Sequence, residues 1–253
     1  MKVTFLGTGT SQGVPVITCN CSVCTSIDFH DKRLRSSILI ETEQTSIVVD
    51  TGPDFRQQML RERVNKLDAI LFTHEHKDHT AGMDDIRSYN FKQQKDMPIY
   101  AHERVLKQLK QEFSYVFAEN KYPGTPSVET IRLENKPFKI GELDIEPIEV
   151  MHYKLPVFGF KIDRFAYITD AKTISEKEKD KIRGLDLLVL NALQKDPHIS
   201  HFTLEEAIAM ANELGAKQTY FTHISHKLGE HSDVEKELPD HIHLAYDGLN
   251  LSL

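Results

Sequence analysis

The pattern of apolar and polar positions predicts short strands along most of the chain. Apolar or alternating runs of four to eight residues, bounded by Gly, Pro, Asn or Asp, are typical of strands. The predicted strands are residues 2–6, 35–41, 45–50, 69–73, 98–101, 128–133, 137–140, 143–150, 157–162, 165–169, 185–190 and 218–222, with a strand-like tail over 241–253.

Helical periodicity lies between these strands. Apolar residues spaced for one face predict helices over 54–64 and 103–118. Helices are also expected over 80–91, over the heavily charged 175–183 and over 203–214. The last has the clearest ends, because Thr203 and Glu206 stand at capping-box positions and Gly215 follows the final turn. Both halves mix strands and helices without a low-complexity linker. We therefore predict an α/β (α+β) fold, two sheets between helix layers, with residues 1–253 as a single domain.

Composition narrows the function classes. Of 253 residues, 40% are apolar and 27% charged, as in an ordinary globular protein. The formal charge of −7 disfavours a nucleic-acid groove. No apolar run reaches the ~18 residues of a membrane span, so no membrane partner is expected. The N-terminus has no apolar core of a signal peptide, and we expect a cytoplasmic protein.

Four potential metal ligands follow the predicted strand 69–73 directly. They form the pattern His74-x-His76-x-Asp78-His79. Neutral imidazole and carboxylate groups suit zinc, iron and manganese. One catalytic ion would not take four ligands from a single loop, because it keeps a position open for water. Two ions are therefore expected, and the alternative is a solvated polar loop. The intervening Glu75 and Lys77 are expected to point to solvent.

Three further donors follow other predicted strands. His152 comes after 143–150, Asp170 after 165–169 and His223 after 218–222. Each stands where a shared site at one edge of the sheets could form. A carboxylate at Asp170 could bridge both ions.

Three cysteines, Cys19, Cys21 and Cys24, fall within six residues. Thiolates at this spacing suit a structural zinc, whose fourth ligand must come from elsewhere. His226 is the first candidate, and His30 and His231 compete with it. The alternative is three buried, inert thiols.

The segments "VVDTGP" (48–53) and "HEHKDH" (74–79) resemble the signature of metallo-β-lactamase-fold hydrolases. The resemblance implies a four-layer αββα sandwich with the site at one edge of the two sheets. It implies that His74, His76 and His152 hold one ion and that Asp78, His79 and His223 hold the other. Asp170 would lie between the ions, and Asp50 would orient a metal ligand.

The N-terminal "FLGTGTSQGVPVITCNCSVC" together with "THISH" resembles phosphoribosyl cyclic phosphate phosphodiesterases of the PhnP type. The resemblance implies a structural zinc on Cys19, Cys21, Cys24 and His226. It also implies that His201 acts as general acid or phosphate contact, and we expect Asp78 and His201 to be catalytic residues. The expected function is hydrolysis of a small, possibly cyclic phosphodiester by a hydroxide held between two cations, zinc or manganese. A homodimer is the default oligomer.

Three other functions compete with this interpretation. An RNA-processing endonuclease resembling the tRNA 3′-end enzymes would need a basic arm, for which 92–126 is the only candidate. A flavodiiron-like or glyoxalase-like enzyme could use the same fold. A zinc protein without catalysis is the third. The Gly-rich "GTGTSQGVP" is either a structural turn or part of a phosphate pocket, and 84–126 is expected to form a pocket wall.

Overall fold

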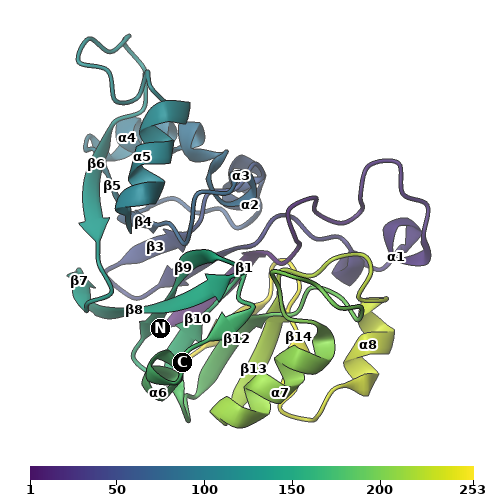
Figure 1. The fold of residues 1–253 in the computed structure, drawn as a ribbon. Helices are drawn as coiled ribbons and strands as arrows, with labels where there is room; N and C mark the ends of the chain where they lie inside the picture. Colours follow the sequence, from purple (N-terminus) through teal and green to yellow (C-terminus); the bar gives the residue numbers. More distant parts are fainter.

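Two β-sheets pack face to face in the computed structural model, which describes all 253 residues (Figure 1). The first sheet has the order β15-β1-β2-β3-β4-β5-β6. Its strands are β1 (Lys2–Gly7), β2 (Ser37–Glu41), β3 (Ser46–Val49), β4 (Ala69–Leu71), β5 (Met97–His102), β6 (Val128–Leu133) and β15 (Asn250–Ser252). Because β3, β4, β5 and β6 run parallel, their carboxyl ends share one edge.

The second sheet has the order β11-β8-β9-β10-β12-β13-β14, and β7 pairs with β8. Its strands are β7 (Phe138–Ile140), β8 (Leu143–His152), β9 (Leu155–Ile162), β10 (Phe165–Tyr167), β11 (Thr173–Ile174), β12 (Leu187–Asn191), β13 (Gln218–Thr222) and β14 (Ile242–Leu244). Four of them, β10, β12, β13 and β14, are parallel neighbours. Their carboxyl ends therefore also meet at one edge.

Apolar burial accounts for the layers. Phe5 of the first sheet and Phe160 and Tyr167 of the second belong to one buried cluster between the sheets. A second cluster joins the first sheet to α2 (Phe55–Arg61), α4 (Arg87–Gln93) and α5 (Glu103–Glu112). A third joins the other sheet to α6 (Glu176–Ile182), α7 (Leu204–Leu214) and α8 (His231–Glu237). The expected αββα sandwich is confirmed, and none of its helices could cross a membrane.

Several predicted helices have different bounds. The expected helix 80–91 is divided into α3 (Lys77–Thr80), a 3₁₀ turn over Met83–Ile86 and α4. The break has a steric reason: a Cβ added at Gly82 would lie 2.2 Å from the carbonyl oxygen of Gly52, so the chain passes closely there. The helix expected over 103–118 already ends at Glu112. The short α1 (Ser22–Thr25), the Phe29–Asp31 3₁₀ turn, β11 and α8 were not predicted.

Candidate metal centre

The carboxyl ends of strands from both sheets bring the histidines and aspartates together. The loop after β4 carries the motif of residues 74–79, and His152 is the last residue of β8. Asp170 follows β10, and His223 follows β13. Strand pairing fixes the backbone of His152 itself and the backbone that ends one to three residues before Asp170, His223 and the first donor of the motif. The sheets thus deliver side chains that are up to 149 residues apart in sequence (223 − 74) to one place.

These side chains form two donor groups that share Asp170. The first is His74, His76, His152 and Asp170, and the second is Asp78, His79, Asp170 and His223; within each group one ligand atom per residue lies within 4.8 Å of the others. Asp170 faces both groups with different oxygens. Its Oδ2 is 3.6 Å from His74 Nε2, and its Oδ1 is 3.2 Å from His223 Nε2. This is the ligand grouping that the resemblance implied.

Hydrogen bonds behind three histidines leave their Nε2 atoms facing the donor groups. His79 Nδ1 donates to Asp50 Oδ2 at 2.7 Å, and His152 Nδ1 donates to the Ser200 carbonyl at 2.9 Å. His74 Nδ1 lies 2.9 Å from Thr73 Oγ1. Such partners fix the tautomer in which Nε2 carries a lone pair, as metal-ligating histidines require.

The buried atoms of the second group fit a cation. His79 Nε2 and both ring nitrogens of His223 are buried without a hydrogen-bond partner. Burying such polar atoms unpaired costs ~1–3 kcal/mol each. A divalent cation between the carboxylates and the Nε2 atoms of His79 and His223 would satisfy these two nitrogens together. The donor chemistry of both groups, imidazole and carboxylate, suits divalent ions such as zinc and manganese.

The charges at the centre are strongly coupled. Burial alone would lower the pKa of His79, but Asp78, Asp170 and Asp50 raise it well above its ordinary value. Burial alone would raise the pKa of Asp78, but the charge on His79 brings it below its usual range. Burial, followed by the charge on His79, lowers the pKa of His74. The three carboxylates therefore favour a positive charge at His79, where the donor group would hold a cation.

Three residues of the centre have left-handed backbones. The φ angles are 64° at Asp50, 59° at Asp170 and 56° at His223. This conformation is uncommon outside glycine and costs about 1–3 kcal/mol where it is strained. Thr73 compensates at Asp50, because its N–H and its hydroxyl each donate to the carboxylate at 2.8 Å. The strand-to-loop corners are thereby turned so that the side chains aim inward.

His201 lies beside the two groups without belonging to either. Its ring stacks on that of His223 with centroids 4.8 Å apart and lies 4.5 Å from the His152 ring. Its Nδ1 is buried without a partner. Burial lowers its pKa to about 3, against the raising effect of Asp170. The neutral ring is thus a hydrogen-bond donor at neutral pH, while His198 bonds locally to Ser200.

Glu75 does not point to solvent, contrary to the sequence-based expectation. Its Oε1 accepts a hydrogen bond from Arg104 Nε at 2.7 Å, and a guanidinium nitrogen of Arg104 donates to the Pro156 carbonyl at 2.6 Å. Arg104 therefore ties the histidine loop to β9. Lys77 does lie at the surface, where it pairs with Glu112 at 2.6 Å. Nothing in the sequence distinguishes Arg104, because one cation at the start of a helix is common.

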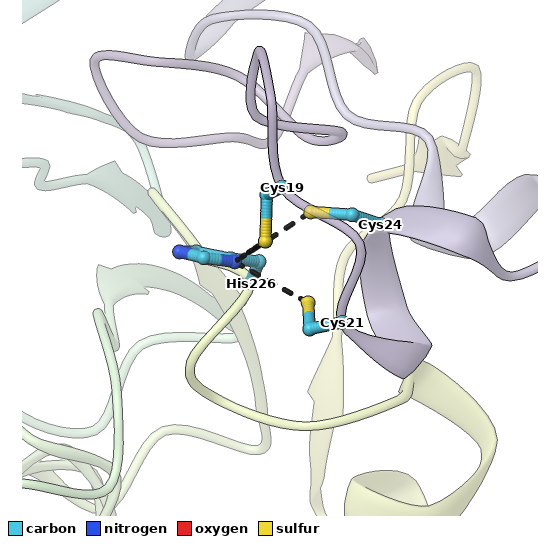
Figure 2. A group of neighbouring side chains, drawn as sticks. All are labelled: Cys19, Cys21, Cys24 and His226. Carbon is cyan, nitrogen blue, oxygen red and sulfur yellow. Dashed lines mark hydrogen bonds between the residues drawn. The ribbon is translucent and has the colours of Figure 1, made fainter.

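The three cysteines converge on one histidine from the other end of the chain. The Sγ atoms of Cys19, Cys21 and Cys24 lie 3.3, 3.4 and 3.5 Å from His226 Nδ1 (Figure 2). The backbone of Cys24 and the ring of His226 hydrogen-bond Cys21 and lower its pKa to about 6, whereas burial raises the pKa of Cys24 to about 11. Four such donors around one point fit a tetrahedral zinc.

The competing histidines are engaged elsewhere. His30 binds Asp28 at 2.7 Å and stacks on His231, whose Nδ1 accepts from Arg33 at 3.0 Å. Arg33 is buried, and it also donates to Thr8 Oγ1 and the Ala245 carbonyl. This arginine links the cysteine segment to the C-terminal strands. Sequence reasoning missed it, because nothing in "DKRLRSS" distinguishes a buried arginine from exposed ones.

Three N–H groups of the Gly-rich turn donate to carbonyl groups of the protein itself. Gly9 donates to the Leu34 carbonyl, Thr10 to Ile224 and Gly13 to Thr10. These bonds favour the structural alternative over a phosphate cradle.

A cleft of about 460 Å³ opens beside the first donor group. Its lining residues are His76, His152, Tyr153, Lys154, Leu155, Ile199 and Ser200. None comes from residues 84–126, so the expectation that this segment forms a pocket wall is wrong for this cleft. The reason is topological: the segment contributes β5 to the first sheet, and its helices α4 and α5 pack on the outer face of that sheet (Figure 1).

Comparison with known proteins identifies the family. The sequence profile described as "Beta-lactamase superfamily domain" matches residues 45–224, well over half of the chain. The chain belongs to the β-lactamase superfamily. Within it, the chain is 40% identical to a crystal structure described as a new diphosphatase from the PhnP family, covering 100% of this chain and 97% of that one at a TM-score of 0.93. Within that superfamily, the chain belongs to the PhnP family.

A curated relative is longer. The octanoyltransferase of Porphyromonas gingivalis is 41% identical over 252 residues, which cover 98% of this chain and 51% of the relative. The chain thus spans about half the length of that protein. Zn²⁺-bound PqqB from Methylobacterium extorquens, at 21% identity and a TM-score of 0.80, has the same fold over the full length of both chains. The short form of human tRNase Z, at 19% identity and 0.74, shares it too.

Proposed function

We propose that this hydrolase is a phosphodiesterase that cleaves a small phosphodiester at a centre of two divalent cations, zinc or manganese. The observation that carries the proposal is the position of Asp170, whose two oxygens face the two donor groups separately. A carboxylate in this position could contribute one oxygen to each of two adjacent cations. In this proposal residues 1–253 act as one domain.

In this proposal His74, His76 and His152 hold one cation, and Asp78, His79 and His223 hold the other, with Asp170 between. When bound, such a pair supplies an activated water and neutralises charge on phosphoryl oxygens. Asp50 and the Ser200 carbonyl keep the tautomers of His79 and His152 through the bonds described above.

His201 has its own role in the proposal. Its neutral ring donates a hydrogen bond from the otherwise unpartnered Nδ1 to a phosphoryl oxygen or to the leaving oxygen. Removing one such preorganised donor costs about 10²–10³ in kcat in other enzymes. His201→Ala should therefore lower kcat about 100-fold with both cations still bound, whereas His198→Ala should change kcat less than about 3-fold. An unchanged kcat in His201→Ala would remove this role.

A structural zinc on Cys19, Cys21, Cys24 and His226 belongs to the same proposal. This zinc would connect the segment that contains α1 with the loop after β13, which also carries His223 (Figure 1). Its function would be to hold that loop, because His223 is only three residues from His226.

The diphosphatase relative supports a phosphoanhydride as a second substrate class, since both reactions attack phosphorus. The RNA-processing alternative finds less support. The stretch 118–126, which extends beyond α5 in Figure 1, contains only one lysine and no arginine, so it lacks the charge to grip RNA. The octanoyltransferase relative takes its name from octanoyl transfer, but this chain matches only about half of that protein. The donor groups of this chain support hydrolysis instead.

The test combines metal analysis with a substrate panel. Protein loaded with zinc or manganese should bind three equivalents of metal, one at the cysteines and two at the Asp170 centre. It should then hydrolyse at least one of four substrates: bis-p-nitrophenyl phosphate, a 2′,3′-cyclic nucleotide, ribose 1,2-cyclic phosphate or a nucleoside 5′-diphosphate. Full loading without turnover of any of them would refute the proposal.

A further inference from the structure

The cleft beside the first donor group has a wall whose chemistry the proposed reaction does not use. His76 and His152 form the part that belongs to the metal centre. The rest comes from two separate segments, the turn between β8 and β9 and the loop around Ile199. A phosphoryl group bound at the centre would therefore have one of its substituents in this cleft. Its volume, about 460 Å³, lies within the ~300–1,000 Å³ range of small-molecule sites.

Tyr153 is an unexpected residue at its position. Tyr153 and Lys154 form the two-residue turn between the paired residues His152 and Leu155. The first position of such turns often needs a left-handed backbone, which favours Asn, Asp or Gly. Tyr153 has a φ of 56°, an outlier for a bulky side chain. Strained backbones of this kind cluster at ligand clamps.

Burial does not explain Tyr153 either. The residue is 51% exposed, and Ile199 on the other segment is 64% exposed, although both line the cleft. The ammonium group of Lys154 lies 5.3 Å from the centre of the Tyr153 ring. An aromatic ring, an apolar side chain and a cation thus border one hollow next to the metal centre. A flat ring joined to an anionic phosphate matches all three groups.

We infer that this cleft is the subsite for a planar aromatic group carried by the phosphoester, so that the substrate class is nucleotide-like. Tyr153 selects the ring by stacking, and Lys154 contributes positive charge near the phosphate. The inference rests on the proposed function for its substrate class, but ligand binding can be measured without turnover.

The test compares two phosphate monoesters, of which only one carries a purine base on its ribose. AMP and ribose 5-phosphate are titrated into the metal-loaded protein by calorimetry. Stacking of one base on an aromatic side chain changes affinity by roughly 10-fold or more. AMP should bind about 10-fold more tightly than ribose 5-phosphate. Tyr153→Asn, which suits the left-handed backbone, should abolish the difference and leave Tm unchanged or higher, while Tyr153→Phe should keep it.

Each other outcome overturns the inference. Equal affinities of the unmodified protein for AMP and ribose 5-phosphate would show that the cleft does not bind the base. A difference that survives in Tyr153→Asn would place the ring elsewhere, and its loss in Tyr153→Phe would assign recognition to the hydroxyl group. Failure of the phosphodiesterase proposal is seen separately, in the turnover panel, because calorimetry requires only that the phosphate binds.

Discussion

Replacing Asp50 with Asn tests how the centre depends on residues that do not face the cations. The carboxylate accepts hydrogen bonds from Thr73 N–H and Thr73 Oγ1 and from His79 Nδ1, at 2.8, 2.8 and 2.7 Å. An Asn in the same place has only one accepting oxygen. If that oxygen keeps the Thr73 N–H bond, the amide NH₂ faces His79 Nδ1. His79 must then move its proton to Nε2, the atom that faces the donor group.

The expected magnitude follows from this tautomer change. Loss of the partner behind a metal-binding histidine typically weakens metal affinity ~10–100-fold, or roughly 1.4–2.8 kcal/mol. The fold should survive, because Asn tolerates the φ of 64° at this position. We therefore expect Asp50→Asn to bind the cation of the Asp78–His79–His223 group about 10–100-fold more weakly.

The assay is competition between protein and a chelator, read as metal content at each free-metal concentration. Asp68→Asn is the matched control. Its carboxylate also accepts a backbone N–H, that of Ser46 at 3.0 Å, but it lies just before β4, at the opposite end of that strand from the histidine loop. The control should bind metal normally. If Asp50→Asn keeps wild-type affinity for both cations, the assignment of His79 as a ligand through Nε2 is wrong.

Three further predictions concern the cysteines, the protons and the histidine loop. Cys24→Ser should lose one equivalent of zinc and several degrees of Tm, since metal binding is coupled to folding, while Ser22→Ala in the same loop should change neither. Lowering the pH from 8 to 6 should weaken metal binding to the Asp170 centre. The carboxylates hold the pKa of His79 above its ordinary value, so the cation must displace a proton from this ring. Calorimetry in two buffers counts the protons that are released. Arg104→Met should lower the free energy of unfolding by ~1–3 kcal/mol, because it leaves a partly buried carboxylate unpaired, whereas Arg132→Met, in an exposed pair, should cost less than ~1 kcal/mol.

Each of these has a contrary result. Cys24→Ser with full zinc content would argue for inert thiols. Metal binding that releases no proton between pH 6 and 8 would mean that His79 is neutral in the metal-free protein. Equal destabilisation by the two arginine substitutions would show that Arg104 does no more than a surface cation.

The sequence predicted the donors because their signal is local or tied to strand ends. Residues 74–79 stand next to each other, and His152, Asp170 and His223 each end a recognisable apolar run. What the sequence could not show depends on contacts between distant segments. The Arg104–Glu75 bond and the buried Arg33 depend on the tertiary arrangement. The close approach at Gly82, where the expected helix is divided, also depends on it. The left-handed angles at Asp50 and Asp170 are equally invisible, because neither is glycine.

The division of the donors between the two sheets has a consequence for the stability of the molecule. The loop after β4 supplies four of them, and the second sheet supplies His152, Asp170 and His223. Any cation that takes ligands from both sheets cross-links the two sheets. Loading with metal should therefore slow hydrogen exchange in both sheets at once, and neither half of the chain, expressed alone, should retain the ions.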